Sequence, residues 1–387
     1  MKKNSNNKKG TSLSLIIFIV ISALVGACFG FIISYKLSND LTAVQFILRL
    51  AEMMLIFFIV MFVHIIIHEA GHLIAGLMRG YRFLSFLMLN VMITRKDGKF
   101  RFSRYSIPGA GGQCLMVPPA EGDTDAGIAF YNAGGIITNA VTGLVSGVIL
   151  MLFYDSMSFE ATVFFMAFAI IGIIFAIQNG VPMTMGGLPN DGRNMKELKK
   201  DKFSTQVFLD TMRITAAMQQ GDDIEKLMPE YKCDGRQLDL SNPIHAMALN
   251  FDLYASLVKM DFAKSCEIID RALESSDKLV SLYYKEFRLE QIFMSLVHPA
   301  YSHDVEKLLD KDILNYMNKM SAVRPDILRL SYTVALLHEH DEKKAEKIYE
   351  RFKKMCKNYH SLSEVRYQTR LVEMVRNMYE KQKEHID

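Results

Sequence analysis

The sequence HEAGH lies inside a membrane-length apolar run, and this placement constrains the fold more than any other feature. Its residues are His68, Glu69, Ala70, Gly71 and His72, and the run MLIFFIVMFVHIII precedes them directly. On an α-helix, residues four apart share a face, so the two histidines can bind one metal ion while Glu69 projects beside them. Flanks that are apolar all round place this helix within or at the edge of a lipid bilayer.

Charge and hydropathy divide the chain into two parts. Half of the 387 residues are hydrophobic in type, yet the second half is rich in charge. We therefore predict a membrane domain followed by a soluble one. A net charge of +3 is too small to indicate nucleic acid as a partner. The five cysteines include no CxxC pair, which argues against a thiolate zinc site and a disulfide framework.

The first apolar run, residues 13–33, is long enough to span a membrane. Lysines before it should keep its N-terminus in the cytoplasm. Residues 25–28 loosely resemble a lipoprotein cleavage box, so a signal peptide is the alternative. Because the apolar stretch continues through residues 29–33, we favour an uncleaved span.

The segment that carries HEAGH is the second predicted span, and it begins on the outer side by alternation. His68 lies 15 residues beyond Met53, which is about 22 Å at 1.5 Å per residue. The motif then falls in the cytoplasmic-side part of a core about 30 Å thick. Residues 79–104 of the following loop include seven basic residues and one acid, Asp97, and the loop should be cytoplasmic by the positive-inside rule.

This basic loop also contains a structural signal. Alternating residues on both sides of Asp97-Gly98 predict a β-hairpin, with residues 83–94 as its first strand. The hairpin is mainly a topology determinant, although its strand edges could also hold an extended substrate. Residues 107–125 are rich in Gly and Pro and predict an irregular loop.

Two more spans are predicted at residues 127–153 and 159–177, joined by a short external turn at 154–158. Lysines follow the last span, so the chain returns to the cytoplasm, and both termini are expected there. The protein should be a multi-pass protein of the cell membrane. Lys and Asn crowd the N-terminus, which indicates an AT-rich bacterial genome.

A catalytic zinc site has three protein ligands, so the two histidines need a third. Asp191 follows the last predicted span, on the same side of the membrane as His68 and His72. Gly and Pro around it would break a helix, and polar backbone at membrane depth is tolerated where it lines a cavity. Asp123 and Asp125, in the irregular loop, are the alternatives.

Together these motifs resemble the site-2 protease family of intramembrane zinc metalloproteases. That family has HExxH on one membrane helix and an Asn-x-x-Pro…Asp-Gly motif on a later one. This chain has HEAGH at 68–72, NGVP at 179–182 and DG at 191–192. The resemblance covers residues 50–195, and the gap between NGVP and DG is longer than is usual in the family.

The resemblance implies roles for individual residues. His68, His72 and Asp191 would hold one Zn²⁺ per chain, and Glu69 would activate water. Asn139 ends the segment AGGIITN, which is similar to a small-residue pattern of the family. This residue and Asn179, the first of NGVP, are candidates for contacts to the substrate or the transition state.

Other histidines have alternative interpretations. His64, one turn before His68, is either a spare ligand or a hydrogen-bonded packing residue. Each four-residue step along an α-helix turns the direction of the side chain by about 40°. His64 is therefore offset from the face that carries His68 and His72, which favours the packing role. The segment His338-Glu339-His340 lacks the four-residue spacing and is typical of an exposed turn.

The second half has the pattern of a soluble helical domain. Asn242-Pro243 is typical of a helix start. Patterns over residues 249–272 and 336–352 resemble degenerate tetratricopeptide repeats. We expect a solenoid-like domain that binds a peptide or protein partner, with a plain helical bundle as the alternative.

The predicted fold is mostly α: a polytopic membrane domain of about four spans with a small β-hairpin, followed by a soluble α-helical, solenoid-like domain. Residues 1–40 form the tail and first span, 41–195 the membrane-embedded metalloprotease domain, and 196–387 the soluble domain.

The predicted function is that of an intramembrane zinc endopeptidase, which cleaves a transmembrane segment or hydrophobic peptide near the cytoplasmic membrane face. The alternative is a membrane scaffold with a structural or vestigial zinc site, whose helical domain recruits a partner. Glu69 argues against it, because a structural site needs no base. A soluble zinc protease would need amphipathic flanks around HEAGH, which the chain lacks.

Reporter fusions test the topology. A reporter after Gly98 or at the C-terminus should be cytoplasmic, and one at Ser156 should be external, because the loop around Gly98 holds seven basic residues. An external signal at Gly98 would contradict the four-span arrangement.

Overall fold

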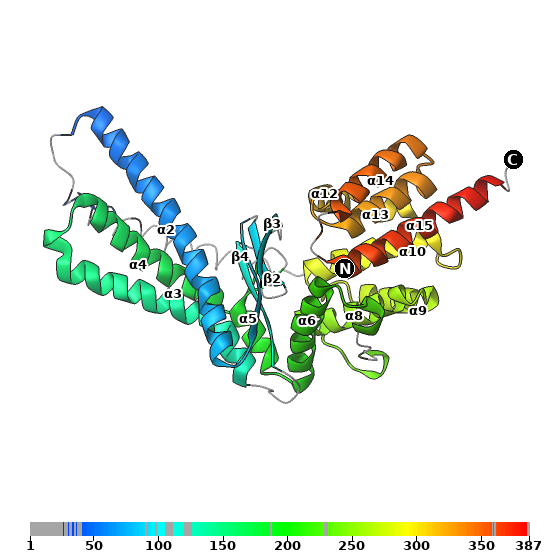
Figure 1. Cartoon of the computed structure of the whole chain (residues 1–387), viewed down its shortest axis with the longest axis horizontal. Helices are drawn as coiled ribbons and strands as arrows, with labels where there is room; N and C mark the ends of the chain where they lie inside the picture. The colour runs from blue at the N-terminus through cyan, green and yellow to red at the C-terminus, as the bar shows by residue number, and fades with distance from the viewer. Residues whose placement is uncertain are drawn as a thin grey trace, which may run out of the picture. The chain divides into compact units, whose positions relative to one another are not determined.

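The computed structural model describes most of the chain from residue 41 onward, and it is mostly helical (Figure 1). It forms two compact units, Met1–His68 with Ile136–Gln178 and Glu69–Gly135 with Asn179–Asp387. The described residues are 26, 30, 33, 34, 36, 41–89, 91–96, 99–104, 111–119, 126–185, 188–227, 231, 233–357, 359 and 361–384.

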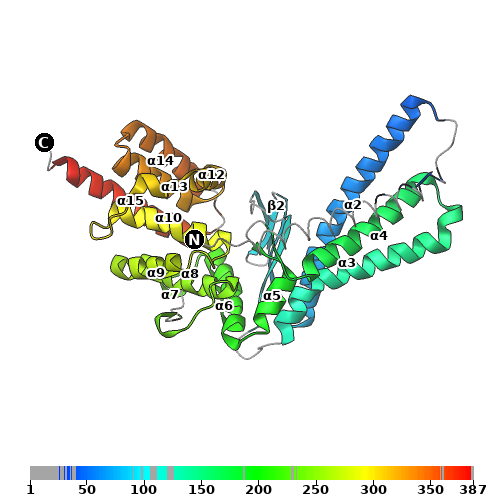
Figure 2. The ribbon, with the colours of Figure 1, turned by 180° about the vertical axis from the view of Figure 1, so that it is seen from behind.

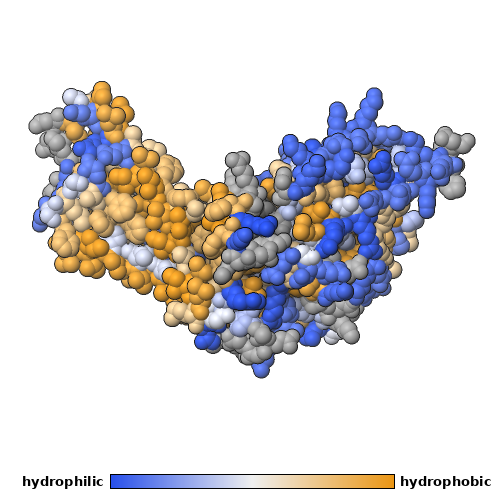
Figure 3. All heavy atoms as spheres, viewed as in Figure 1, coloured by the Kyte–Doolittle hydropathy of each residue, from blue (hydrophilic) through white to orange (hydrophobic). Residues whose placement is uncertain are grey.

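Three helices among the described residues are long and apolar enough to cross a membrane: α2 (Ala43–Met78), α3 (Ala126–Phe153) and α4 (Phe159–Gly180). Exposed apolar side chains cover most of these helices on the face shown (orange in Figure 3). A 3₁₀ turn, η1 (Tyr154–Ser156), joins α3 to α4. Three of the predicted spans are thus present as helices. Most of the first predicted span lies outside the described residues.

Small residues let α3 and α4 approach closely. A Cβ atom on Gly143 would lie 3.1 Å from the carbonyl oxygen of Ala169, and one on Gly172 would lie 2.9 Å from Cα of Gly143. Ser146 Oγ donates to the carbonyl of Phe165 at 2.9 Å. In lipid, close packing and interhelical hydrogen bonds hold helices together, so these contacts explain the small residues in this pair.

A four-stranded antiparallel sheet follows α2, in the order β3-β2-β1-β4. Strands β2 and β3 pair from Val91–Arg104 to Lys96–Lys99, which confirms the predicted hairpin. Asp97 and Gly98, its predicted turn, lie outside the described residues. The strands are β1 (Arg82–Met88), β2 (Val91–Lys96), β3 (Lys99–Arg104) and β4 (Gly112–Val117).

Two details of the predicted loop were wrong. Residues 83–94 are two strands, because the chain turns at Leu89, whose φ is +52°. A leucine in this left-handed region costs about 1–2 kcal/mol, which the pairing of β1 with strands on both sides offsets. Residues 112–117, expected to be irregular, form β4, in which Cys114 and Met116 are buried on one face.

The rest of the second unit is mostly helical (Figure 2). Two short antiparallel strands of two residues each, β5 (Thr184–Met185) and β6 (Leu188–Pro189), precede these helices. The α-helices are α5 (Asp191–Leu198), α6 (Lys202–Gln220), α7 (Ile224–Leu227), α8 (Pro243–Val258), α9 (Phe262–Glu274), α10 (Ser281–Val297), α11 (Val305–Leu308), α12 (Lys311–Met320), α13 (Pro325–Thr333), α14 (Glu342–Cys356) and α15 (Leu362–Glu384). Two further segments are the 3₁₀ turn η2 (Cys233–Gly235) and the short π-helix η3 (Val334–His338).

Several local expectations for this half hold. Asn242 caps α8 by accepting from the N–H of Ile244, with Pro243 at the first helical position. Helices α8 and α9 pack as a pair, as do α13 and α14, and Ser256 and Ser265 are hydrogen-bonded at 2.8 Å between the first two. Residues 338–340 are exposed, as expected. The repeat assignment and the solenoid arrangement stay predictions.

Candidate metal centre

Three predicted ligands lie together. His68 and His72 are one turn apart on α2 and are 8% and 6% exposed. Asp191 is the first residue of α5. One ligand atom from each residue lies within 4.8 Å of the other two. Among the residues that the structure describes, no other group of three potential ligands forms such a cluster.

The orientation of His72 is set by a backbone carbonyl. Its Nδ1 lies 2.7 Å from the carbonyl oxygen of Tyr131 on α3. A carbonyl oxygen only accepts, so Nδ1 carries the hydrogen and Nε2 has the lone pair. Nε2 lies 3.4 Å from Oδ2 of Asp191. The ring therefore presents the correct nitrogen for a metal on the Asp191 side.

Asn139 lies behind the other histidine. Its side chain is fully buried and lies 3.2 Å from Nδ1 of His68 and 3.1 Å from Nδ1 of His64. The second ring nitrogen of His64 lies 2.9 Å from the carbonyl oxygen of Phe168. Both nitrogens of His64 thus have partners outside the ligand cluster, as expected for a packing residue. The predicted contact of Asn139 to substrate stays a prediction.

The sheet positions Glu69. The carboxylate is buried, and its Oε2 accepts from the backbone N–H of Cys114 in β4 at 2.6 Å. A Cβ atom on Gly112 would lie 2.8 Å from Cγ of Glu69, so the glycine leaves room for the carboxylate. Burial, and then the charge of Glu69, raises the pKa of the Cys114 thiol to about 12. This thiol stays protonated and is no candidate nucleophile.

Asn190 fixes the start of the helix that carries Asp191. Its Oδ1 accepts from the backbone N–H groups of Arg193 (2.9 Å) and Met183 (3.1 Å). Its Nδ2 donates to the carbonyl of Val181 at 2.7 Å. Our sequence analysis missed this residue, although Asn directly before a helix is an N-cap signal.

The DG motif requires its glycine. A Cβ atom on Gly192 would collide with the carbonyl oxygen of Gly180 and would lie 2.9 Å from that of Asn179. Only glycine lets α5 start so close to the end of α4. The extra residues between Pro182 and Asp191 include the hairpin β5–β6. The predicted role of the Asn179 side chain stays a prediction.

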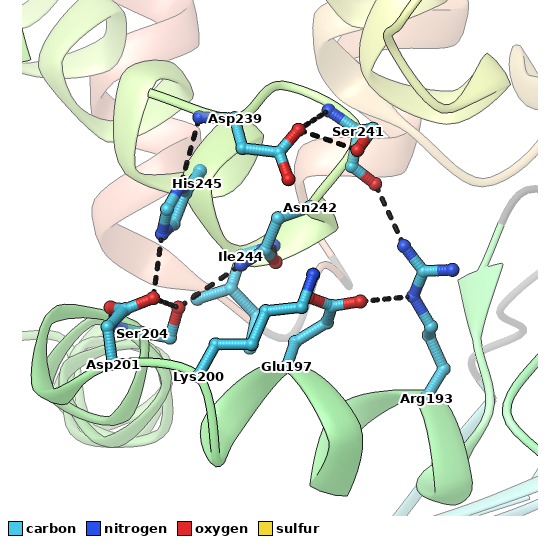
Figure 4. Close-up of polar contacts among 10 residues, drawn as sticks. All are labelled: Arg193, Glu197, Lys200, Asp201, Ser204, Asp239, Ser241, Asn242, Ile244 and His245. Atoms are coloured by element: carbon cyan, nitrogen blue, oxygen red, sulfur yellow. Dashed lines mark hydrogen bonds and ion pairs between the residues drawn. The ribbon is translucent and has the colours of Figure 1, made fainter. Parts of the chain in front are cut away.

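Two ion pairs surround Glu197 of α5, and a hydrogen bond from Arg193 connects this helix to the start of α8 (Figure 4). Glu197 is fully buried, and its carboxylate lies 2.7 Å from Nε of Arg193 and 2.6 Å from Nζ of Lys200. Arg193 also donates to the carbonyl of Ser241, directly before the cap of α8, at 3.0 Å. The helix that begins with Asp191 is thereby fixed to the second half of the chain.

This donor set fits zinc. Two imidazoles and a carboxylate, all largely buried, are the ligand types of a catalytic zinc site with three protein ligands. Each imidazole has a polar partner at Nδ1, as metal-binding histidines do. The alternative ligands Asp123 and Asp125 lie outside the described residues.

Comparison with known families supports the same class of protein. The model described as "Peptidase family M50" matches residues 56–365, which is most of the chain. This chain belongs to peptidase family M50. The comparisons with curated proteins and with solved structures found no match.

Members of this family are membrane-embedded zinc metalloproteases, so the resemblance to site-2 proteases is confirmed. The chain is a membrane protein of the metallopeptidase class. The family match continues into the helical second half, whose tetratricopeptide-like character it does not confirm.

The ligand set of this M50 peptidase can be tested by metal analysis. The purified protein should carry about one zinc per chain, and His68→Ala, His72→Ala or Asp191→Ala should remove it, because two ligands hold the ion poorly. Asp191→Asn should be nearly as damaging, since a neutral amide is a poor zinc ligand. If Asp191→Ala keeps its metal, this set must be abandoned and Asp123→Ala and Asp125→Ala examined.

The support of α5 can be tested separately. Glu197→Ala leaves Arg193 without its buried counter-charge and should lower the free energy of unfolding by about 1–3 kcal/mol. Zinc affinity should fall as well, because Asp191 lies on the same short helix. Lys200→Ala is the control: its side chain is 44% exposed, so the change should stay within about 0.5 kcal/mol. Equal unfolding temperatures for both variants would contradict this account.

Proposed function

We propose that this M50 peptidase is an intramembrane zinc endopeptidase, which cleaves a transmembrane segment or hydrophobic peptide near the cytoplasmic membrane face. The observation that carries the proposal is the position of Glu69. This buried carboxylate follows His68 directly on α2, beside the cluster of two histidines and Asp191. A structural zinc site has no use for such a base.

Each residue of the site has a separate role in peptide hydrolysis. Zinc, when bound, would polarise the scissile carbonyl and lower the pKa of water at the site. Glu69 takes a proton from the attacking water and gives it to the leaving amine. The N–H of Cys114 on Oε2 holds the carboxylate in one orientation during both transfers. His68, His72 and Asp191 would hold the metal ion as its ligands.

A transmembrane substrate must be extended before it is cut, because helical hydrogen bonds hide its carbonyls. Edge strands can hold an extended segment by adding it to the sheet. Strands β3 and β4 are the edges of the sheet next to α2, and β4 supplies the N–H that binds Glu69. The edge of β4 is the better candidate, since a segment there would lie near the base.

The remaining assignments follow the same reasoning. Three candidate spans and a basic loop support a multi-pass protein of the cell membrane. With the first predicted span, residues 13–33, the number of spans is even and both termini lie in the cytoplasm. The helices of the second half would recruit a peptide or protein partner. No feature of the described residues favours the scaffold alternative.

The test of the proposal is Glu69→Gln. The amide preserves the shape of the side chain but cannot accept the proton of water, so zinc should stay bound while cleavage falls by at least about 100-fold. Membrane proteins that accumulate in cells carrying this variant are candidate substrates, and their cleavage is then measured with purified protein. Glu52→Gln, on the same helix, should cleave normally. Full activity of Glu69→Gln would disprove the mechanism.

A further inference from the structure

His64 is a buried polar residue that the proposed mechanism does not use. It lies on α2, one turn before His68, and is 0% exposed. Its Nε2 lies 2.9 Å from the carbonyl oxygen of Phe168 on α4, and its Nδ1 lies 3.1 Å from the side chain of Asn139 on α3. An ionisable side chain inside an apolar span calls for a reason.

The carbonyl of Phe168 decides where His64 carries its hydrogen. A carbonyl oxygen only accepts, so Nε2 must be the N–H of a neutral ring, and Nδ1 has the lone pair. A doubly protonated ring would bury a charge in an apolar span, which is costly. Nδ1 therefore needs a donor, and the amide nitrogen of Asn139 is the donor that faces it.

This requirement fixes the amide of Asn139. In the structure, Oδ1 lies toward His64 and Nδ2 toward His68. The two atoms have nearly the same size, so the hydrogen bonds around the amide decide between its two orientations. With Nδ2 toward His64, Oδ1 faces Nδ1 of His68 and accepts its hydrogen. With Nδ2 toward His68, Nδ1 of His68 would have to accept, and the hydrogen of the neutral ring would lie on Nε2. Nε2 could not then bind a metal.

Both ends of this series of hydrogen bonds thus require the same orientation of the Asn139 amide. The Phe168 carbonyl requires it from one side, and the role of His68 as a ligand requires it from the other. The result matches His72, whose Nδ1 donates to the carbonyl of Tyr131. A backbone carbonyl can only accept, whereas an asparagine can present either end, so its orientation must be set by a further residue.

Packing around His64 agrees with this role. A Cβ atom on Gly172 would lie 2.7 Å from Cε1 of His64 and 2.8 Å from the carbonyl oxygen of Asn139. The glycine in α4 therefore provides the space in which the ring sits. The ring of Phe168 lies against it, with centroids 4.2 Å apart.

We propose that His64 and Asn139 are positioning residues that select the ring tautomer of His68, so that Nε2 of His68 faces the metal. The inference rests on the proposed zinc site. The order of the contacts is the Phe168 carbonyl, His64, Asn139 and His68. His64 acts through Asn139 and binds no metal itself.

Zinc affinity of the full-length protein, measured by competition with a chelator, tests this assignment. His64→Phe fills the space but cannot accept from Asn139, and zinc binding should weaken by about 10- to 100-fold. His64→Gln should restore affinity to within about threefold, because its amide can accept from Asn139 and donate to the Phe168 carbonyl. Phe175→Leu, which alters another ring beside His64, is the control and should bind zinc normally.

Nitrogen NMR of histidine-labelled protein reads the tautomers directly, with or without zinc. His64 should carry its hydrogen on Nε2, and His68 on Nδ1. The proposal is overturned if His64 carries its hydrogen on Nδ1, or if His64→Phe binds zinc as tightly as the unaltered protein. If the unaltered protein binds no zinc, the proposed zinc site fails instead, and the NMR result still decides on the tautomers.

Discussion

A buried polar group inside an apolar span must find its hydrogen-bond partner in the protein, because the bilayer core offers no water. Helix α2 carries four such groups, the three histidines and Glu69. Another element supplies the partner of each: α4 and α3 for His64, α3 for His68 and His72, and β4 for Glu69. These contacts give every buried polar group of α2 named here a hydrogen-bond partner within the protein.

Close approach of backbones makes these partners available. A Cβ atom on Gly134 would collide with the carbonyl of Gly71, within the motif itself, and one on Gly172 would collide with His64. In lipid, small residues allow the distances at which carbonyls and side chains can bond across helices. The glycines of this chain therefore serve the polar groups at the site as well as the packing of the helices.

The three ligands are held by different means. One helix sets the spacing of His68 and His72, so this part of the site is local. Asp191 depends on contacts between distant segments: Asn190 holds the start of α5 to the residues after α4, and Arg193 bonds to Ser241, 48 residues away. The position of Asp191 consequently depends more on distant parts of the fold than the positions of the two histidines do.

The sequence by itself determined the local features: the spacing within HEAGH, three of the spans, the hairpin and the cap at Asn242, because apolar length, periodicity and capping depend on neighbouring residues. It also indicated Asp191 through membrane sidedness and family resemblance. The tertiary structure alone decided that residues 112–117 form a strand, which depends on pairing with β1. It also decided that Asn139 lies between two histidines, because hydrogen bonds between helices join residues that no sequence period relates.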